Sequence, residues 1–106
     1  MTLNKRTDSI FHLAIPTHDL KAAKQFYIEV LGCRLDREYN DRITLDFFGD
    51  KLVCHLAPNE IDPNPKMYPR HFGRTFIEKS TFDRTIESAK KYGVRFLEEP
   101  SIRFAE

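Results

Sequence analysis

The stretch FHLAIPTHDLKAAKQFYIEVLGC, residues 11–33, sets the pattern from which the fold can be read. Its opening alternates, with apolar residues at positions 11, 13 and 15 on one face and His12 on the other. Alternation with a period of two is typical of a strand with one buried face. Pro16 is expected to end this strand, because proline cannot donate a ladder hydrogen bond.

The remainder of that stretch predicts a helix of about three turns. Apolar side chains recur at positions 20, 23, 26, 27, 30 and 31, which is the spacing of one helix face. Asp19 is a suitable N-cap, since its carboxylate can accept hydrogen bonds from the first free N–H groups. Gly32 suits the position just after the helix, where a positive φ is common.

Three shorter strands and a linker follow the helix. Residues 33–39 give the weakest strand pattern, whereas residues 43–48 and 51–57 give strong ones, joined by a turn at Gly49-Asp50. Four prolines between residues 58 and 69 predict a linker that is neither helix nor central strand. Residues 9–58 therefore form a β-α-β-β-β module.

The second half repeats this order. The segment from His71 to Ile77 alternates as a strand, a possible capping box begins at Ser80, and Gly93 closes a helical stripe before a strand at 94–98. The glycine follows the histidine after 20 residues in the first half and after 22 in the second. We therefore expect one α+β domain over 1–106, built from paired βαβββ modules, with the second module (70–104) truncated to βαβ.

Composition excludes several classes of protein. The 106 residues carry 17 Lys+Arg and 16 Asp+Glu, so no basic excess suggests nucleic acid as a partner. No run approaches the roughly 20 apolar residues of a membrane span, and no export signal follows Met1. The two cysteines, Cys33 and Cys54, form no disulfide framework, so reduced thiols in a cytoplasmic protein are expected.

Histidines carry most of the possible chemistry. His12 and His71 occupy matching strand positions of the two modules, and neutral imidazoles are common ligands of divalent metals. The alternative is two unrelated strand histidines. His55 is either a third ligand, a proton-transfer group or an outward polar residue. Asp46 alternates with apolar neighbours and either lines the same cavity or is solvated.

Other chemistry has no support in the sequence. There is no glycine-rich phosphate loop, no Gly-x-Ser-x-Gly elbow and no Cys-x-x-Cys pair. Nucleotide-dependent, serine-hydrolase and zinc-ribbon functions are therefore not indicated.

These motifs together resemble the vicinal oxygen chelate superfamily, the group of glyoxalase I, bleomycin-resistance proteins and extradiol dioxygenases. The resemblance covers roughly residues 9–104. It rests on the strand bearing His12, on the Asp-Leu…Ala…Phe-Tyr…Leu-Gly string that follows, and on three later segments, namely 47–49, 52–56 and 71–73.

The resemblance implies a metal site. The family's first-strand ligand falls on His12, the ligand of the second module on His71, and a fourth-strand ligand of some members on His55. The ion would be Fe²⁺, Mn²⁺, Ni²⁺ or Zn²⁺, and Asp46 and Arg103 are assigned to substrate binding. The usual last-strand glutamate has no counterpart, since Glu106 arrives too early in the chain.

The resemblance also implies a small oxygen-bearing substrate and chemistry of the lyase, isomerase or dioxygenase type, with no catalytic residue assigned. The alternatives are a non-catalytic protein that binds or sequesters a small molecule, a truncated module that assembles with a second chain, and a fragment of a longer enzyme. An unpaired sheet edge favours a homodimer or a strand-swapped oligomer.

Overall fold

The computed structural model describes residues 8–101 of the chain. The chain divides into two compact units, Met1–Pro63 and Asn64–Glu106. None of the described helices is both long and apolar enough to cross a membrane.

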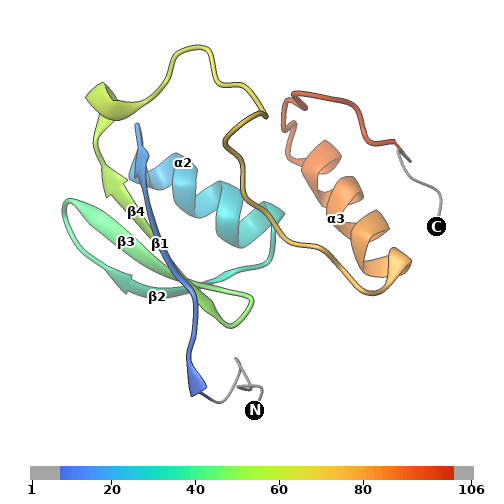
Figure 1. Cartoon of the computed structure of the whole chain (residues 1–106), viewed down its shortest axis with the longest axis horizontal. Helices are drawn as coiled ribbons and strands as arrows, with labels where there is room; N and C mark the ends of the chain where they lie inside the picture. The colour runs from blue at the N-terminus through green and yellow to red at the C-terminus, as the bar shows by residue number, and fades with distance from the viewer. Residues whose placement is uncertain (1–7, 102–106) are drawn as a thin grey trace. The chain divides into compact units, whose positions relative to one another are not determined.

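The first unit contains a four-stranded mixed sheet (Figure 1). Its strands are β1 (His12–Thr17), β2 (Arg34–Glu38), β3 (Arg42–Phe47) and β4 (Asp50–Leu56). They lie in the order β1-β4-β3-β2, with β1 parallel to β4 and the other neighbours antiparallel. With the helix after β1, this is the expected β-α-β-β-β module, and the α+β class is confirmed.

Pro16 does not end β1, contrary to the expectation from sequence. The strand runs through it to Thr17, and Pro16 lies opposite His55 of β4. β1 lies at the edge of the sheet, where a residue without an N–H group can face away from the neighbouring strand.

The helix that follows has two parts. An α-helical turn, α2 (Leu20–Lys24), continues directly into a π-helical segment, η1 (Gln25–Val30). Gly32 follows with a φ of +84°, as expected for the position after a helix end. Apolar periodicity predicts the helix but not the π-helical turn, because the spacing of apolar residues does not show which carbonyl accepts each backbone hydrogen bond.

Asp19 caps the helix as its position indicates. Its Oδ1 accepts hydrogen bonds from the backbone N–H groups of Lys21 (2.8 Å) and Ala22 (3.3 Å). Replacing Asp19 by alanine should lower the free energy of unfolding by about 1 kcal/mol, measured by urea denaturation. The variant Asp19→Asn should be nearly neutral because an asparagine side chain caps equally well, and an equal loss for both variants would contradict this role.

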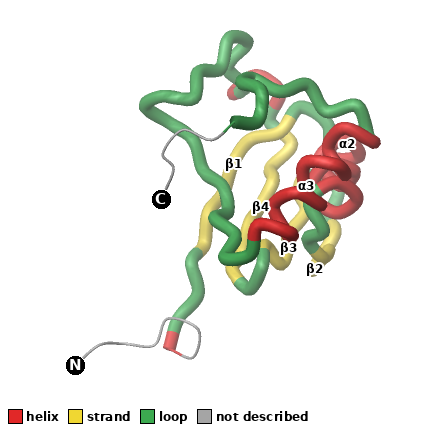
Figure 2. The backbone as a smooth tube through the Cα atoms, turned by 90° about the vertical axis from the view of Figure 1, so that its right-hand side faces the viewer, coloured by secondary structure: helices red, strands yellow, loops and turns green. Residues whose placement is uncertain are grey.

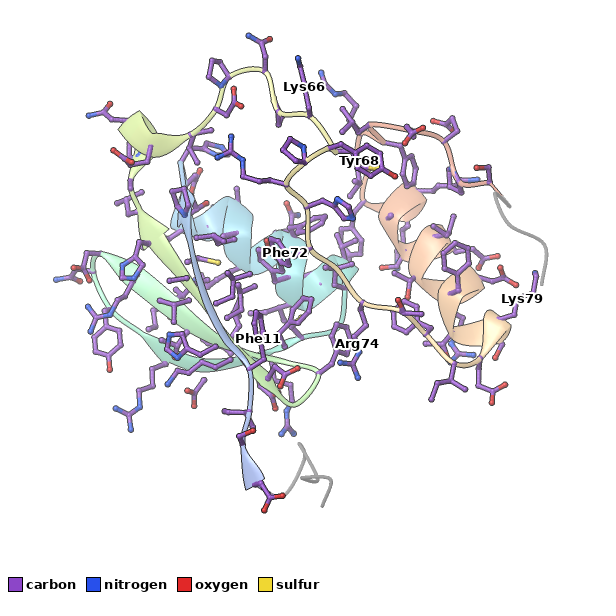
Figure 3. All side chains as sticks on the ribbon, in the orientation of Figure 1. Phe11, Lys66, Tyr68, Phe72, Arg74 and Lys79 are labelled. Carbon is purple, nitrogen blue, oxygen red and sulfur yellow. The ribbon has the colours of Figure 1, made fainter. Side chains whose placement is uncertain are left out.

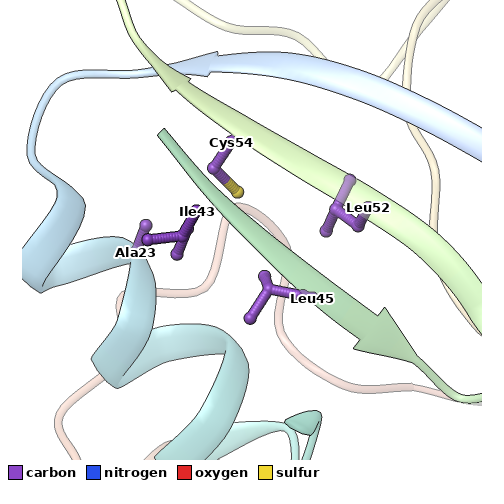
Figure 4. Close-up of a cluster of buried hydrophobic side chains, with 5 residues drawn as sticks. All are labelled: Ala23, Ile43, Leu45, Leu52 and Cys54. Atoms are coloured by element: carbon purple, nitrogen blue, oxygen red, sulfur yellow. The ribbon is translucent and has the colours of Figure 1, made fainter. Parts of the chain in front are cut away.

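The core lies between the helical segment and one face of the sheet. Its fully buried side chains come from the two central strands, and Ala23 of α2 packs against them (Figure 4). The strand residues of this cluster are Ile43, Leu45, Leu52 and Cys54. Leu13 and Ile15 of β1 join the same side, so the helix covers the face opposite His12.

The β3–β4 hairpin turns one residue earlier than expected. Its turn residues are Phe48 and Gly49, with φ values of +55° and +96°, and Asp50 already belongs to β4. Two consecutive positive φ angles give the twist that matches a two-residue hairpin. Glycine adopts such angles freely, but a phenylalanine rarely does.

The second unit is described by one helix, α3 (Lys79–Lys91), and by loops. The helix confirms the predicted stripe, and Gly93 follows it with a φ of +70°. The predicted capping box does not form, because Glu78 precedes the helix and no side chain caps it.

The strands predicted at 71–77 and 94–98 are absent from the described part of the second unit (Figure 2). A strand requires a hydrogen-bonded neighbour, and sequence alternation alone does not supply one. This part of the prediction is therefore wrong, although the order of segments around α3 is as expected.

Candidate functional site

The helix-free face of the first unit's sheet carries most of the polar residues singled out from sequence. Register places His12 opposite Lys51, and Lys51 opposite Asp46, so these three residues form one row across three strands. His12 and Lys51 lie on the face turned away from the core cluster, as the alternation along β1 predicts. His12 is exposed on this face, so its side chain is available to a ligand rather than to the core.

His55 lies on the same face but in a different row. It pairs with Pro16 and Arg42, four residues along the strands from the row of His12. Four residues of strand correspond to about 13 Å. Strand register therefore separates the backbones of His12 and His55, and a role for His55 as a third ligand or a proton-transfer group stays a prediction.

Asp46 has structural partners. Its Oδ2 lies 3.5 Å from a guanidinium nitrogen of Arg34, and its Oδ1 accepts a 2.7 Å hydrogen bond from the N–H of Gly49. The carboxylate thus stabilises the β3–β4 turn and pairs with β2. From the sequence, Asp46 was expected either to line a cavity or to be solvated, and neither expectation included this structural role.

His71 of the second unit has a fixed ring. Its Nδ1 lies 2.8 Å from the carbonyl oxygen of Met67, and the ring of Tyr68 (labelled in Figure 3) meets it edge-on at 5.4 Å. Because a carbonyl only accepts, Nδ1 is the donor in this hydrogen bond and Nε2 is the nitrogen left for another partner. A metal-bound histidine usually has this arrangement, with its second nitrogen donating to a backbone carbonyl.

Arg103, the second residue assigned to substrate binding, lies outside the described residues. Among residues 8–101, no three or more His, Cys, Asp or Glu side chains cluster closely enough to hold a metal ion. The histidines nevertheless suit a divalent ion as donors, since His12 is exposed and His71 has its ring oriented.

A group of cations around Tyr39 was not recognised from sequence. The Arg42 guanidinium carbon lies 3.8 Å from the centre of the Tyr39 ring, and Arg37 Nη1 donates to the Tyr39 hydroxyl at 3.5 Å. The hydrogen bond from Arg37, followed by the charges of Arg37, Arg42 and Lys51, lowers the pKa of this phenol. The signal in the sequence was the high density of basic residues on both sides of the predicted turn at 40–41. However, β2 contains a bulge, and the odd–even alternation of residues along a strand does not show where a bulge lies.

Both cysteines are free and buried. Burial raises the pKa of each thiol from its ordinary value of 9.0 to about 11, and the charge of Asp46 adds to the effect on Cys33. Burial likewise raises the pKa of Tyr27, with smaller contributions from the two thiols. These groups favour the neutral, folded state and offer no nucleophile at neutral pH.

The raised thiol pKa values predict loss of stability at alkaline pH. The unfolded thiols ionise near pH 9 and the folded ones near 11, so the contribution is complete below pH 9 and falls between pH 9 and 11. Urea denaturation measured from pH 7 to 10 should show this decline. A Cys33→Ala/Cys54→Ala variant should have a flatter curve between pH 9 and 10, and an unchanged slope would contradict the assignment.

Comparisons with known proteins show the family and the fold. Residues 9–105 match the model of the Glyoxalase/Bleomycin resistance protein/Dioxygenase superfamily. The chain belongs to this superfamily. Membership confirms the resemblance read from the motifs around His12.

Solved structures of the glyoxalase superfamily share the fold. A glyoxalase/bleomycin resistance protein/dioxygenase from Alicyclobacillus acidocaldarius is 54% identical, with a TM-score of 0.81 over 92% of this chain and 73% of the other. A lactoylglutathione lyase from Agrobacterium tumefaciens is 20% identical, with a TM-score of 0.59 over 86% of this chain and 74% of that one. At that identity the second likeness concerns the fold alone. No curated protein matches the sequence.

Proposed function

We propose that this glyoxalase-superfamily chain binds a divalent metal ion through His12 and His71 and uses it to bind a small substrate through two oxygen atoms. One observation carries the proposal: His12 lies on β1, on the helix-free face of the sheet, in a chain that belongs to this superfamily. An exposed imidazole on that face is available to an ion, whereas the opposite face is filled by the core.

His71 supports the proposal through the state of its ring. The hydrogen bond to the Met67 carbonyl uses Nδ1 and orients the ring, which leaves Nε2 as the nitrogen that would bind the metal. The ion would supply an open coordination position that polarises the bound oxygens. The proposed ion is Fe²⁺, Mn²⁺, Ni²⁺ or Zn²⁺.

Other residues of the chain would transfer protons, position the β3–β4 turn and contact the substrate. His55, on the same face and four residues along the strands from His12, would be the proton-transfer group. Asp46 would position the β3–β4 turn beside the row that contains His12. Arg103 remains a predicted substrate contact. A lyase, isomerase or dioxygenase reaction is compatible with these groups.

A second copy of the chain is the proposed partner. β1 is an edge strand, and an edge of this kind can accept a further strand by backbone hydrogen bonds. We propose that a homodimer, by exchange or addition of strands, supplies ligands beyond His12 and His71.

Metal content and oligomeric state together test the proposal. The purified chain should contain close to one divalent ion per protomer after dialysis against Zn²⁺ or Mn²⁺, measured by elemental analysis, and light scattering should give a dimer. Absence of stoichiometric metal would overturn the metal proposal and favour the metal-free small-molecule-binding alternative. A monomer that holds metal stoichiometrically would overturn only the dimer.

A further inference from the structure

We infer that Asp50 is a positioning residue for His12, because its side chain holds the backbone of the residue directly before that histidine. The inference rests on the proposed function, since it assigns Asp50 to the site through which His12 would bind a divalent ion. The sequence pattern placed Asp50 in a turn. In the structure it is the first residue of β4, next to Lys51, the register partner of His12.

Both backbone polar groups of Phe11 (labelled in Figure 3) are bound by the start of β4. Its carbonyl oxygen accepts a 2.8 Å hydrogen bond from the N–H of Lys51. Its N–H donates to Oδ1 of Asp50 at 3.0 Å, across 39 residues of sequence. These two bonds fix the chain immediately before His12.

The Asp50 side chain supplies this acceptor because the β3–β4 turn displaces the backbone one. In a parallel pair, an N–H that faces the neighbouring strand donates to the carbonyl one residue before its level partner. Continuing the observed register by one residue places Phe11 level with Asp50. The regular acceptor would then be the carbonyl oxygen of Gly49, but Gly49 belongs to the turn and has a φ of +96°. The carboxylate therefore extends the ladder by one bond beyond His12.

His12 depends on this support because of its place in the strand. It is the first residue of β1, and in the described sheet β1 pairs with β4 alone. Since the carbonyl and the N–H of Phe11 face β4, those of the next residue, His12, face away from it. The position of the imidazole is thus set by the residues on either side. Strand ends open locally at little cost, and a metal ligand that moves loses affinity for its ion.

Asp50→Ala should weaken Zn²⁺ binding by the full chain roughly tenfold, the lower end of the cost of losing an orienting partner. Competition with a chromophoric chelator measures the affinity. In the metal-free chain the same change should speed hydrogen exchange of the Phe11 amide about fivefold or more, measured by NMR. Asp50→Asn should preserve both properties, because an amide oxygen also accepts this bond.

Asp41→Ala is the control for loss of one negative charge. Asp41 precedes β3 at the opposite end of the sheet and pairs there with Arg42, so its replacement should change the affinity less than twofold. The His12→Ala background separates positioning from general stability. There Asp50→Ala should cause less than a further twofold loss, because Asp50 acts through His12.

Four results would overturn the role of Asp50 alone and leave the metal function intact. These are a wild-type affinity of Asp50→Ala, an equal loss in Asp50→Asn, a further tenfold loss in the His12→Ala background, and unchanged exchange of the Phe11 amide. Absence of stoichiometric metal in the wild-type chain would overturn the proposed function and this inference with it.

Discussion

Replacing His12 by alanine should weaken Zn²⁺ or Mn²⁺ binding by about 100-fold or more. Loss of groups that merely orient a ligand costs about 10- to 100-fold, so loss of the ligand itself should cost at least as much. His12 is exposed at the edge strand, so the variant should keep its fold. A competition titration against a chromophoric chelator measures the change.

The other histidines give matched controls for that result. His18 is exposed in the turn before Asp19, so its replacement by alanine should leave the affinity within a factor of two. His71→Ala should reproduce the loss seen for His12. His55→Ala should not, because the register separates it from His12 by about 13 Å. Equal affinities of wild type and His12→Ala would refute the assignment.

Replacing Leu52 by alanine should cost about 2–5 kcal/mol of unfolding free energy. Leu52 is 1% exposed and belongs to the core between the sheet and the helical segment, where a cavity would remain after truncation. Leu56→Ala is the matched control on the same strand. That side chain is 44% exposed, so its truncation should cost less than about 1 kcal/mol.

Urea denaturation followed by tyrosine circular dichroism can compare these variants, because the chain has four tyrosines and no tryptophan. Equal destabilisation by Leu52→Ala and Leu56→Ala would show that burial in β4 does not control stability. If Leu52→Ala lowers the free energy of unfolding no more than is expected for Leu56→Ala, Leu52 does not belong to the core.

Local signals predicted the first unit well. Alternation around His12 indicated the strand and the face on which the histidine lies, and Asp19 and Gly32 marked the helix ends correctly. These features depend on residues a few positions apart, so no knowledge of distant partners is needed. The prediction that Pro16 ends the first strand was wrong, because the effect of a missing backbone N–H depends on whether the strand is central or at an edge.

Features that depend on distant partners were not predicted. Alternation at 71–77 and 94–98 resembles a strand, yet no neighbouring strand pairs with either in the described residues. The cluster around Tyr39 depends on a bulge between Leu35 and Arg37, which changes the face of every later residue in β2. The odd–even alternation of residues in the sequence does not show where such an extra residue lies.

The sequence by itself determined the superfamily, the first module and the face of His12, because each follows from short-range periodicity and from motifs close together in the chain. Only the tertiary structure decided how far apart the two strand histidines of the first unit lie. In the sequence, His12 and His55 are both histidines of predicted strands. Strand register places His12 opposite Lys51 and His55 opposite Pro16, four residues apart along the strands. Register is set by the packing of whole strands against the helix and one another, and no single segment encodes it.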